Sequence, residues 1–386
     1  MIHLCYAVSD KKGTYTKLLG TSMRSVFAHT EEWVTVHLLH DHSLSEDNRR
    51  YLMQLVRSFG QQLEFHDLEK KYKDRLLPLE KINPNISRGC LYRLLAGEEL
   101  ADVERLIYLD ADTIVNLDIK ELWEEETGAN GFAAVGDKVI QEKHSSHLVE
   151  KGLCEESRYF NAGVLLLDMS TLSREKNLLE RGVTFLEQHK LMDYPEQDIL
   201  NYFFSEACRL LPEKYNIFVG WEIRERRNET GECIYRYAGV HAFDYGSNYH
   251  RLFWDNFVAT PWCNADFFCR LAHNIQQSTR SKLLIYANLT AGKRRIVVGP
   301  EKEQEKYTKM LMLREKERYL PATQLHTQGM NLTPGEILIL FLPFDEYGQV
   351  KKHLESCGAL EGVHFLNGMM LTTPDAMQDA KAFLEA

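Results

Sequence analysis

Over its first two thirds, the chain alternates short runs of β-branched and aromatic residues with segments of helical periodicity. This alternation is typical of βαβ units, whose strands lie mostly parallel in one sheet. The predicted elements follow in the order strand 2–8, helix 15–27, strand 33–40, helix 45–60 and strand 62–68. We therefore predict an α/β fold in which a mixed sheet is flanked by helices.

The pattern changes after Trp262, where the chain becomes basic, helical and rich in loops. Near Thr333 a short β-α-β pattern begins, which is too small to be stable alone. We expect three parts: a main domain over 1–265, a basic helical extension over 266–330 and a small unit over 331–386. The small unit should pack against the main domain or against a second copy of the chain in a homodimer.

Charge and hydropathy exclude several classes of protein. The net charge of −10 argues against a general nucleic-acid binder. No stretch approaches the roughly 20 apolar residues that a membrane span needs. The first ten residues lack the basic region of a signal peptide, and the eight cysteines form no C-x-x-C pair. We expect a cytoplasmic protein with reduced thiols and no zinc site.

One segment departs from the acidic average. Residues 270–318 hold twelve Lys or Arg against five Glu, a charge of +7 in a chain that otherwise carries −17. Such a cluster, centred on Lys293, Arg294 and Arg295, predicts peripheral contact with the anionic inner face of a membrane. Alternating signs in "EKEQEK" and "REKER" equally fit solvated helices.

The run "RLIYLDADTIV" (105–115) places Asp110 and Asp112 one residue apart at the end of an apolar strand. If the strand continues through them, both carboxylates face the same side and can bind one Mn²⁺ or Mg²⁺ that also holds a diphosphate. The same letters resemble the first motif of haloacid-dehalogenase-like phosphatases, with Asp110 as nucleophile and Asp112 as acid/base. That motif normally opens its domain, however, and Ile114 stands where Thr or Val is expected.

Two later blocks, "YFNAGVLLLDM" and "PEQDILNYFF", add to the aspartate motif. With them the chain resembles the family 8 glycosyltransferases, which include glycogenin and bacterial lipopolysaccharide galactosyl- and glucosyltransferases. The resemblance covers about 2–262. It implies a GT-A fold, retaining stereochemistry, a UDP-linked sugar donor and Mn²⁺ or Mg²⁺ as cofactor.

The resemblance also implies roles for single residues. Gln197 and Asp198 match the catalytic triplet, and Asp137 an acidic residue at the sugar pocket. Asp110 and Asp112 match the family's metal-binding pair, and His241 completes the predicted set of metal ligands without matching the family's histidine position. The remaining residues expected to contact the donor are Ala7, Ser9, Asp10, Arg93, Ala111, Asn161, Ala162, Glu196, Arg236 and Gly239.

Several positions depart from the family pattern. Ser9 replaces an aspartate, Lys11 an asparagine, and Glu196 the first Asp of the triplet. In "RYAGVHAFDY", Arg236 falls on the histidine that supplies the third metal ligand, and Ala242 falls on a phosphate-binding lysine. Arginine cannot ligate a cation. His241 is then one candidate for the third ligand, and direct contact between Arg236 and the diphosphate is the other interpretation.

The resulting hypothesis is a metal-dependent hexosyltransferase that moves glucose or galactose from a UDP-sugar to a glycan acceptor. The expected setting is cell-surface polysaccharide or lipopolysaccharide biosynthesis. The alternative is a catalytically impaired module that binds a nucleotide sugar or acts as a scaffold.

Overall fold

The computed structural model describes the chain in two units, Met1–Phe267 and Phe268–Phe383. It describes all residues except 83–87, 143–145, 173–176, 190–193, 245, 272, 274–285, 287, 312, 314–317, 323–334 and 372–386. Within the described residues, no helix combines the length and the apolar character that crossing a membrane requires.

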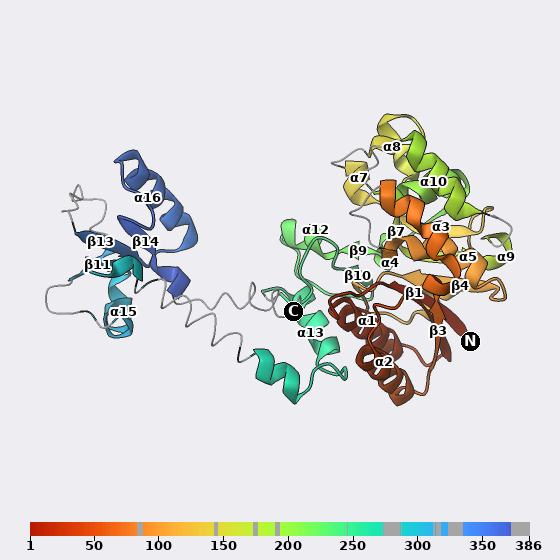
Figure 1. The fold of residues 1–386 in the computed structure, drawn as a ribbon, viewed down its shortest axis with the longest axis horizontal. Helices are drawn as coiled ribbons and strands as arrows, with labels where there is room; N and C mark the ends of the chain where they lie inside the picture. Colours follow the sequence, from red (N-terminus) through yellow and green to blue (C-terminus); the bar gives the residue numbers. More distant parts are fainter. Residues whose placement is uncertain are drawn as a thin grey trace. The chain divides into compact units, whose positions relative to one another are not determined.

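The first unit is built on a seven-stranded mixed sheet, which confirms the predicted α/β class (Figure 1). The three N-terminal strands and β4 are parallel, whereas β7 runs antiparallel to both β4 and β6. The order across the sheet is β3 (Gln62–Asp67), β2 (Val34–His40), β1 (Ile2–Val8), β4 (Arg105–Leu109), β7 (Phe160–Asp168), β6 (Phe132–Gly136) and β8 (Arg209–Leu211).

Strand direction decides which residues gather at one edge of this sheet. The carboxyl ends of β1, β2, β4 and β6 lie at the same edge, and so does the start of the antiparallel β7. Ser9, Asp41, Asp110 and Asp137 directly follow the four strands, and Asn161 is the second residue of β7. Ligands of open α/β sheets bind beyond this edge, so the topology alone brings these polar residues to one place.

Helices cover both faces of the sheet (Figure 1). On one side α1 contacts α2 and α13, and on the other α3 contacts α10, which contacts α11. Ser45 caps α2 by accepting from Asn48 N, as predicted. The bounds are α1 (Tyr15–His29), α2 (Glu46–Ser58), α3 (Leu68–Ile82), α4 (Arg88–Tyr92), η1 (Arg93–Leu95), α5 (Ala96–Glu99), α6 (Lys120–Trp123), α7 (Lys138–Glu142), α8 (His147–Glu150), α9 (Met169–Leu172), α10 (Leu178–Gln188), α11 (Pro195–Phe204), α12 (Val219–Arg224) and α13 (Asn248–Phe257).

The aspartate motif is not one continuous strand, contrary to the prediction. Strand β4 ends at Leu109, and the chain turns through 110–112 before β5 (Thr113–Val115) begins in a separate three-stranded sheet. There β5 pairs antiparallel with β10 (Ile234–Arg236), whose other neighbour is β9 (Ile217–Phe218). Asp110 and Asp112 therefore lie at a junction between two sheets.

The second unit contains a four-stranded parallel sheet in the order β12 (Arg318–Pro321), β11 (Arg294–Gly299), β13 (Glu336–Leu340) and β14 (Phe365–Asn367). Its described helices include α15 (Gln304–Met310) and α16 (Phe344–Ser356). The sequence predicted a helical extension separate from the β-α-β unit, but β11 and β12 of that segment join the same sheet as β13. The central strands are apolar and buried, which explains how this unit builds a core of its own.

Candidate active site

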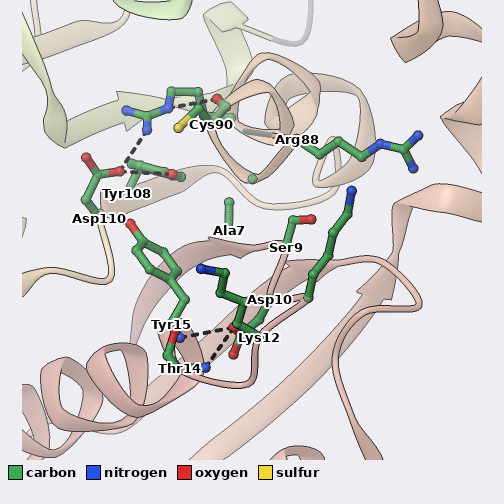
Figure 2. Close-up of a pocket in the computed structure, with 13 residues that line it drawn as sticks. Ala7, Ser9, Asp10, Lys12, Thr14, Tyr15, Arg88, Cys90, Tyr108 and Asp110 are labelled. Carbon is green, nitrogen blue, oxygen red and sulfur yellow. Dashed lines mark hydrogen bonds and ion pairs between the residues drawn. The ribbon is translucent and has the colours of Figure 1, made fainter. Parts of the chain in front are cut away.

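A pocket of about 590 Å³ opens at the carboxyl end of β1 (Figure 2). Its wall combines the loop after β1, the start of α4 and the end of β4. Four cationic side chains line it, whereas the described acidic lining residues are Asp10 and Asp110. The cations are Lys11, Lys12, Arg88 and Arg93. Such a wall suits a ligand that carries negative charge.

Asp10 and Ser9, both predicted to contact the donor, hold the loop that forms this wall. The carboxylate of Asp10 accepts from the backbone N–H groups of residues 14, 15 and 16 at 2.8–3.1 Å, which fixes the start of α1. Ser9 donates to Asp41 Oδ2 at 2.7 Å. Ala7 lines the pocket floor beside them. The loop is therefore pre-shaped by its own side chains.

Asp110 lies between two arginines. Arg93 Nη2 is 2.8 Å from Asp110 Oδ1, and Arg236 Nη2 is 2.7 Å from Asp110 Oδ2. Arg93 also donates to the carbonyl of Ala162 at 2.5 Å. Burial alone would lower the pKa of Arg93 and of Arg236, but the neighbouring carboxylates raise both values. Both guanidinium groups are therefore charged, and each oxygen of Asp110 has a cationic partner.

Arg236 reaches this position because β10 pairs with β5. Arg236 lies opposite Thr113 in the register, and Tyr237 N donates to Asp112 O at 2.9 Å. The guanidinium carbon stands 5.6 Å from the centroid of the Phe218 ring, within the range of a cation–π contact. Its Nε is 3.7 Å from Asp112 Oδ1. The pairing of two short strands thus places a fixed cation between both aspartates.

A second buried cluster adjoins the aspartates and contains the predicted sugar-pocket residues. Asn161 Nδ2 donates to Asp137 Oδ2 at 2.9 Å and to Gln197 Oε1 at 3.0 Å. Gln197 Nε2 donates to Asp137 Oδ2 at 3.1 Å. Arg236 Nη1 donates to Asn161 Oδ1, so the arginine joins the cluster to Asp110. These five side chains form one connected polar network.

Asp198 and Glu196 take different positions on α11. Asp198 is fully buried and accepts from the Tyr159 hydroxyl at 2.7 Å and from Tyr194 N at 3.0 Å. Glu196 is partly exposed and lies on the side of Cys90, because burial and then the charge of Glu196 raise the pKa of the Cys90 thiol. Asp198 therefore fixes the start of the helix that presents Gln197.

The family model "Glycosyl transferase family 8" matches residues 7–240, which contain the pocket and the whole network. The chain belongs to glycosyl transferase family 8. The family predicted from the aspartate and "FNAG" blocks is thereby confirmed, and with it the expectation of a hexosyltransferase.

Two curated relatives and one solved structure illustrate the relationship. The chain is 35% identical over 135 residues to lipopolysaccharide 1,2-glucosyltransferase of Escherichia coli, covering 34% of this chain and 38% of that protein. It is 28% identical over 205 residues to lipopolysaccharide 1,3-galactosyltransferase of Salmonella typhimurium, covering 51% and 58%. The matches thus span less than two thirds of either relative.

The galactosyltransferase LgtC, solved with donor and acceptor sugar analogs, has a similar fold. The TM-score is 0.57 at 22% identity, over 69% of this chain and 99% of LgtC. This likeness confirms the GT-A architecture.

Enzymes of family 8 and the GT-A fold use a nucleotide sugar and a divalent metal, so the fit of a cation to these residues can be tested. Both oxygens of Asp110 already bind guanidinium groups. His241 is exposed. Among the described residues, the group of three possible ligands with atoms within 4.8 Å of one another is His37, Glu64 and His66, on β2 and β3. As these side chains lie, the predicted ligand set does not fit a divalent cation.

The remaining predicted residues are structural neighbours of the network. Ala111 is buried in the turn between the aspartates. Gly239 has a φ of +75° in the turn after β10, which a side chain would strain.

Sequence reasoning missed two contributors to the network and one residue that holds the pocket loop. Tyr159 holds Asp198 and accepts from Gln197 Nε2 at 3.2 Å. Asn216 donates to Asn161 Oδ1 at 2.9 Å, and Asp41 accepts from Ser9. Tyr159 directly precedes the "FNAG" block, and Asp41 directly follows β2. Both residues could therefore have been predicted as site residues from their positions next to a predicted site and a strand end. Asn216 carries no such signal.

Proposed function

We propose that this family 8 enzyme transfers a hexose, glucose or galactose, from a UDP-sugar to a glycan acceptor with retention of configuration. The observation that carries the proposal is the polar network described above. It places Asn161, Gln197 and Asp137 next to Asp110, which itself lines the cationic pocket. Phosphate-binding and hydroxyl-binding groups thus meet at one sheet edge.

The pocket is the proposed site of the nucleotide diphosphate. A UDP leaving group carries at least two negative charges, which Lys11, Lys12 and Arg93 are placed to neutralise. The volume of about 590 Å³ lies within the range of small-molecule sites. Ala7, which has no bulky side chain, leaves room for the base at the end of β1.

The transferred sugar is assigned to the side of Asn161 and Gln197. Amide side chains both donate and accept, so a sugar hydroxyl can take the place of one of their present partners in the network and be held in a fixed orientation. Asp137 accepts hydrogen bonds from both amides and the Tyr159 hydroxyl accepts one from Gln197, which fixes their orientation. Amides held in this way favour one defined orientation of the sugar over the diphosphate.

The acceptor is proposed to be a cell-surface glycan, by analogy with the lipopolysaccharide glucosyl- and galactosyltransferases among the relatives. The predicted membrane contact through 270–318 would bring the enzyme to a lipid-linked acceptor. Part of that segment lies outside the described residues. Mn²⁺ or Mg²⁺ bound by Asp110, Asp112 and His241 is not carried into this proposal, because the ligand set does not fit.

The decisive experiment measures UDP release from UDP-glucose, UDP-galactose and the corresponding UDP-N-acetylhexosamines. We expect release from one UDP-hexose, and a fall in its rate by about tenfold or more in Gln197→Ala. The matched control is Gln188→Ala, at the end of α10, where the same side chain lies outside the network. No release from any donor, although UDP binds, would contradict transfer.

That outcome would favour a second candidate, a non-catalytic nucleotide-sugar-binding module. One specific observation supports it: Arg236 stands where the family has a metal-ligating histidine, and it forms a buried ion pair with Asp110.

A further inference from the structure

The two aspartates of the motif are already bridged by a positive charge that belongs to the chain. Arg236 Nη2 is 2.7 Å from Asp110 Oδ2, and Arg236 Nε is 3.7 Å from Asp112 Oδ1. The side chains of Arg236, Asp110 and Asp112 are 15%, 8% and 18% exposed. A divalent cation shared by the two carboxylates would have to displace this guanidinium from a nearly buried site.

We propose that Arg236 replaces the divalent cation, so that this enzyme binds its UDP-sugar and transfers the hexose without a metal. The inference rests on the proposed function and concerns the same site. The guanidinium holds Asp110 and Asp112 in place and supplies the fixed positive charge that the diphosphate needs as the glycosidic bond breaks.

The position of Arg236 is determined by the fold and does not depend on a flexible surface rotamer. Strand pairing fixes its backbone beside Asp112, Phe218 covers its guanidinium, and Asn161 accepts from Nη1. If the Arg236 side chain moved away, the buried carboxylate of Asp110 would keep Arg93 as its one described guanidinium partner. Removing one partner of a buried ion pair lowers stability far more than removing one partner of an exposed ion pair, because a buried charge is left uncompensated.

Two buried polar atoms at this position have no hydrogen-bond partner among the described residues. They are Arg236 Nε and Asp112 Oδ1, which face each other at 3.7 Å. Unpaired buried polar atoms are rare because each costs free energy. If the Asp112 side chain moved slightly closer to Arg236, its Oδ1 would accept a hydrogen bond from Arg236 Nε and both atoms would be paired. We assign this movement to donor binding.

The charges around Asp110 and Asp112 also favour a guanidinium group between the two carboxylates. Arg236 offsets negative charge at the two aspartates, as a bound cation would. Lys11, Lys12 and Arg88 of the pocket wall add further positive charge for the diphosphate. Arginine presents five donors in a fixed plane, a geometry that matches phosphate oxygens and carboxylates alike.

The test measures the dissociation constant of UDP by calorimetry, in EDTA and in Mn²⁺, for the wild-type chain, Arg236→His and Arg236→Ala. Wild type should bind UDP equally in both buffers, within about twofold. Arg236→Ala should bind at least about tenfold more weakly in EDTA, because a charge-assisted contact is lost. Arg236→His restores the family's ligand type and should bind tightly only in Mn²⁺.

The outcomes separate this inference from the proposed function. UDP binding by the wild type in Mn²⁺ but not in EDTA overturns the inference and leaves the proposed function standing. Absence of UDP binding in both buffers overturns the proposed function as well. UDP affinity is the readout because His37, Glu64 and His66 could take up Mn²⁺ elsewhere and obscure direct metal titration.

Two controls address folding. Arg251→His replaces an arginine that is 79% exposed on α13 and pairs with Asp255, so it should leave UDP affinity unchanged in both buffers. If Arg236→His fails to fold, Arg236→Lys keeps the charge without the planar fork. It should bind UDP in EDTA more tightly than Arg236→Ala, and equal affinities of the two would overturn the inference.

Discussion

A Cβ atom at Gly163 would lie 2.5 Å from the guanidinium carbon of Arg236. Gly163 follows Asn161 and Ala162 on β7, so the absence of a side chain there creates the space that Arg236 fills. The guanidinium cannot yield cheaply, because Asp110 and Asn161 hold it.

The first prediction follows from that contact. Gly163→Ala should push Arg236 away from Asp110 and lower the free energy of unfolding by roughly 1–3 kcal/mol, the usual range for overpacking. UDP release should fall with it. Gly231→Ala is the matched control, since nothing lies within 4 Å of a Cβ there. Equal stability of the two variants in urea titrations would contradict this account.

The second prediction is an asymmetry between the two aspartates. Asp110→Asn leaves Arg93 and Arg236 buried with a neutral partner and should cost about 3–5 kcal/mol. Asp112→Asn should cost clearly less, because burial raises the pKa of Asp112 and its Oδ1 has no described hydrogen-bond partner. Urea unfolding of both variants measures the difference. A larger loss in Asp112→Asn would show that the pairing is assigned wrongly.

The third prediction separates sugar from nucleotide contacts. Gln197→Ala should lower kcat by about tenfold or more while the Kd of UDP stays nearly unchanged, since Gln197 lies in the network beyond the pocket wall. Steady-state kinetics and calorimetry give the two values. A matching loss of UDP affinity would place Gln197 at the nucleotide instead.

The fourth prediction concerns pH. Burial, with His66 and His3 nearby, lowers the pKa of His37 to about 4, and Glu64 faces it from β3. The unfolded chain binds this proton near pH 6.5, so unfolding becomes easier as the pH falls from 6.5 towards 4. The loss should be roughly 2 kcal/mol after allowance for solvent around the half-exposed Glu64.

The comparison for that prediction is His37→Gln, because His3 and His40 also have lowered pKa values and contribute to the wild-type slope. The difference in slope between wild type and variant isolates His37. Parallel stability curves between pH 4 and 6.5 would contradict the prediction.

The fifth prediction addresses the basic segment 270–318. The enzyme should bind anionic but not neutral vesicles, and high salt should release it. Structure refines the choice of variants, because Arg295 donates to Leu311 O inside the unit. Lys302→Gln with Lys306→Gln should weaken vesicle binding, whereas Lys70→Gln with Lys73→Gln on α3 should not. Equal binding to both vesicle types would favour the alternative interpretation, in which these are solvated surface charges that bind no membrane.

Local pattern predicted most elements of the first unit, since apolar runs and capping residues are local signals. It predicted one strand over 105–115 because Thr113, Ile114 and Val115 favour extended backbone and nothing in the run marks a break. The break arises from pairing with β10, more than a hundred residues away. The basic segment was predicted as helical for a similar reason. The apolar centre of β11 is short and lies among many charged residues, and the strand is stabilised by pairing with β12 and β13.

The candidate site was predictable where residues follow strands. Asp110, Asp137 and Asn161 come together because their strands end or begin at one edge. Asn216 and the bridging place of Arg236 depend on long-range register, which spacing does not encode.

The division of the chain at Phe267 and Phe268 has a consequence for how such enzymes diversify. Every residue assigned to the donor belongs to the first unit, whereas the second carries its own sheet and core. Natural recombination could exchange the C-terminal unit while donor chemistry is inherited intact. Grafting the second unit of another family member after Phe267 should therefore leave unchanged which sugar nucleotide the enzyme consumes.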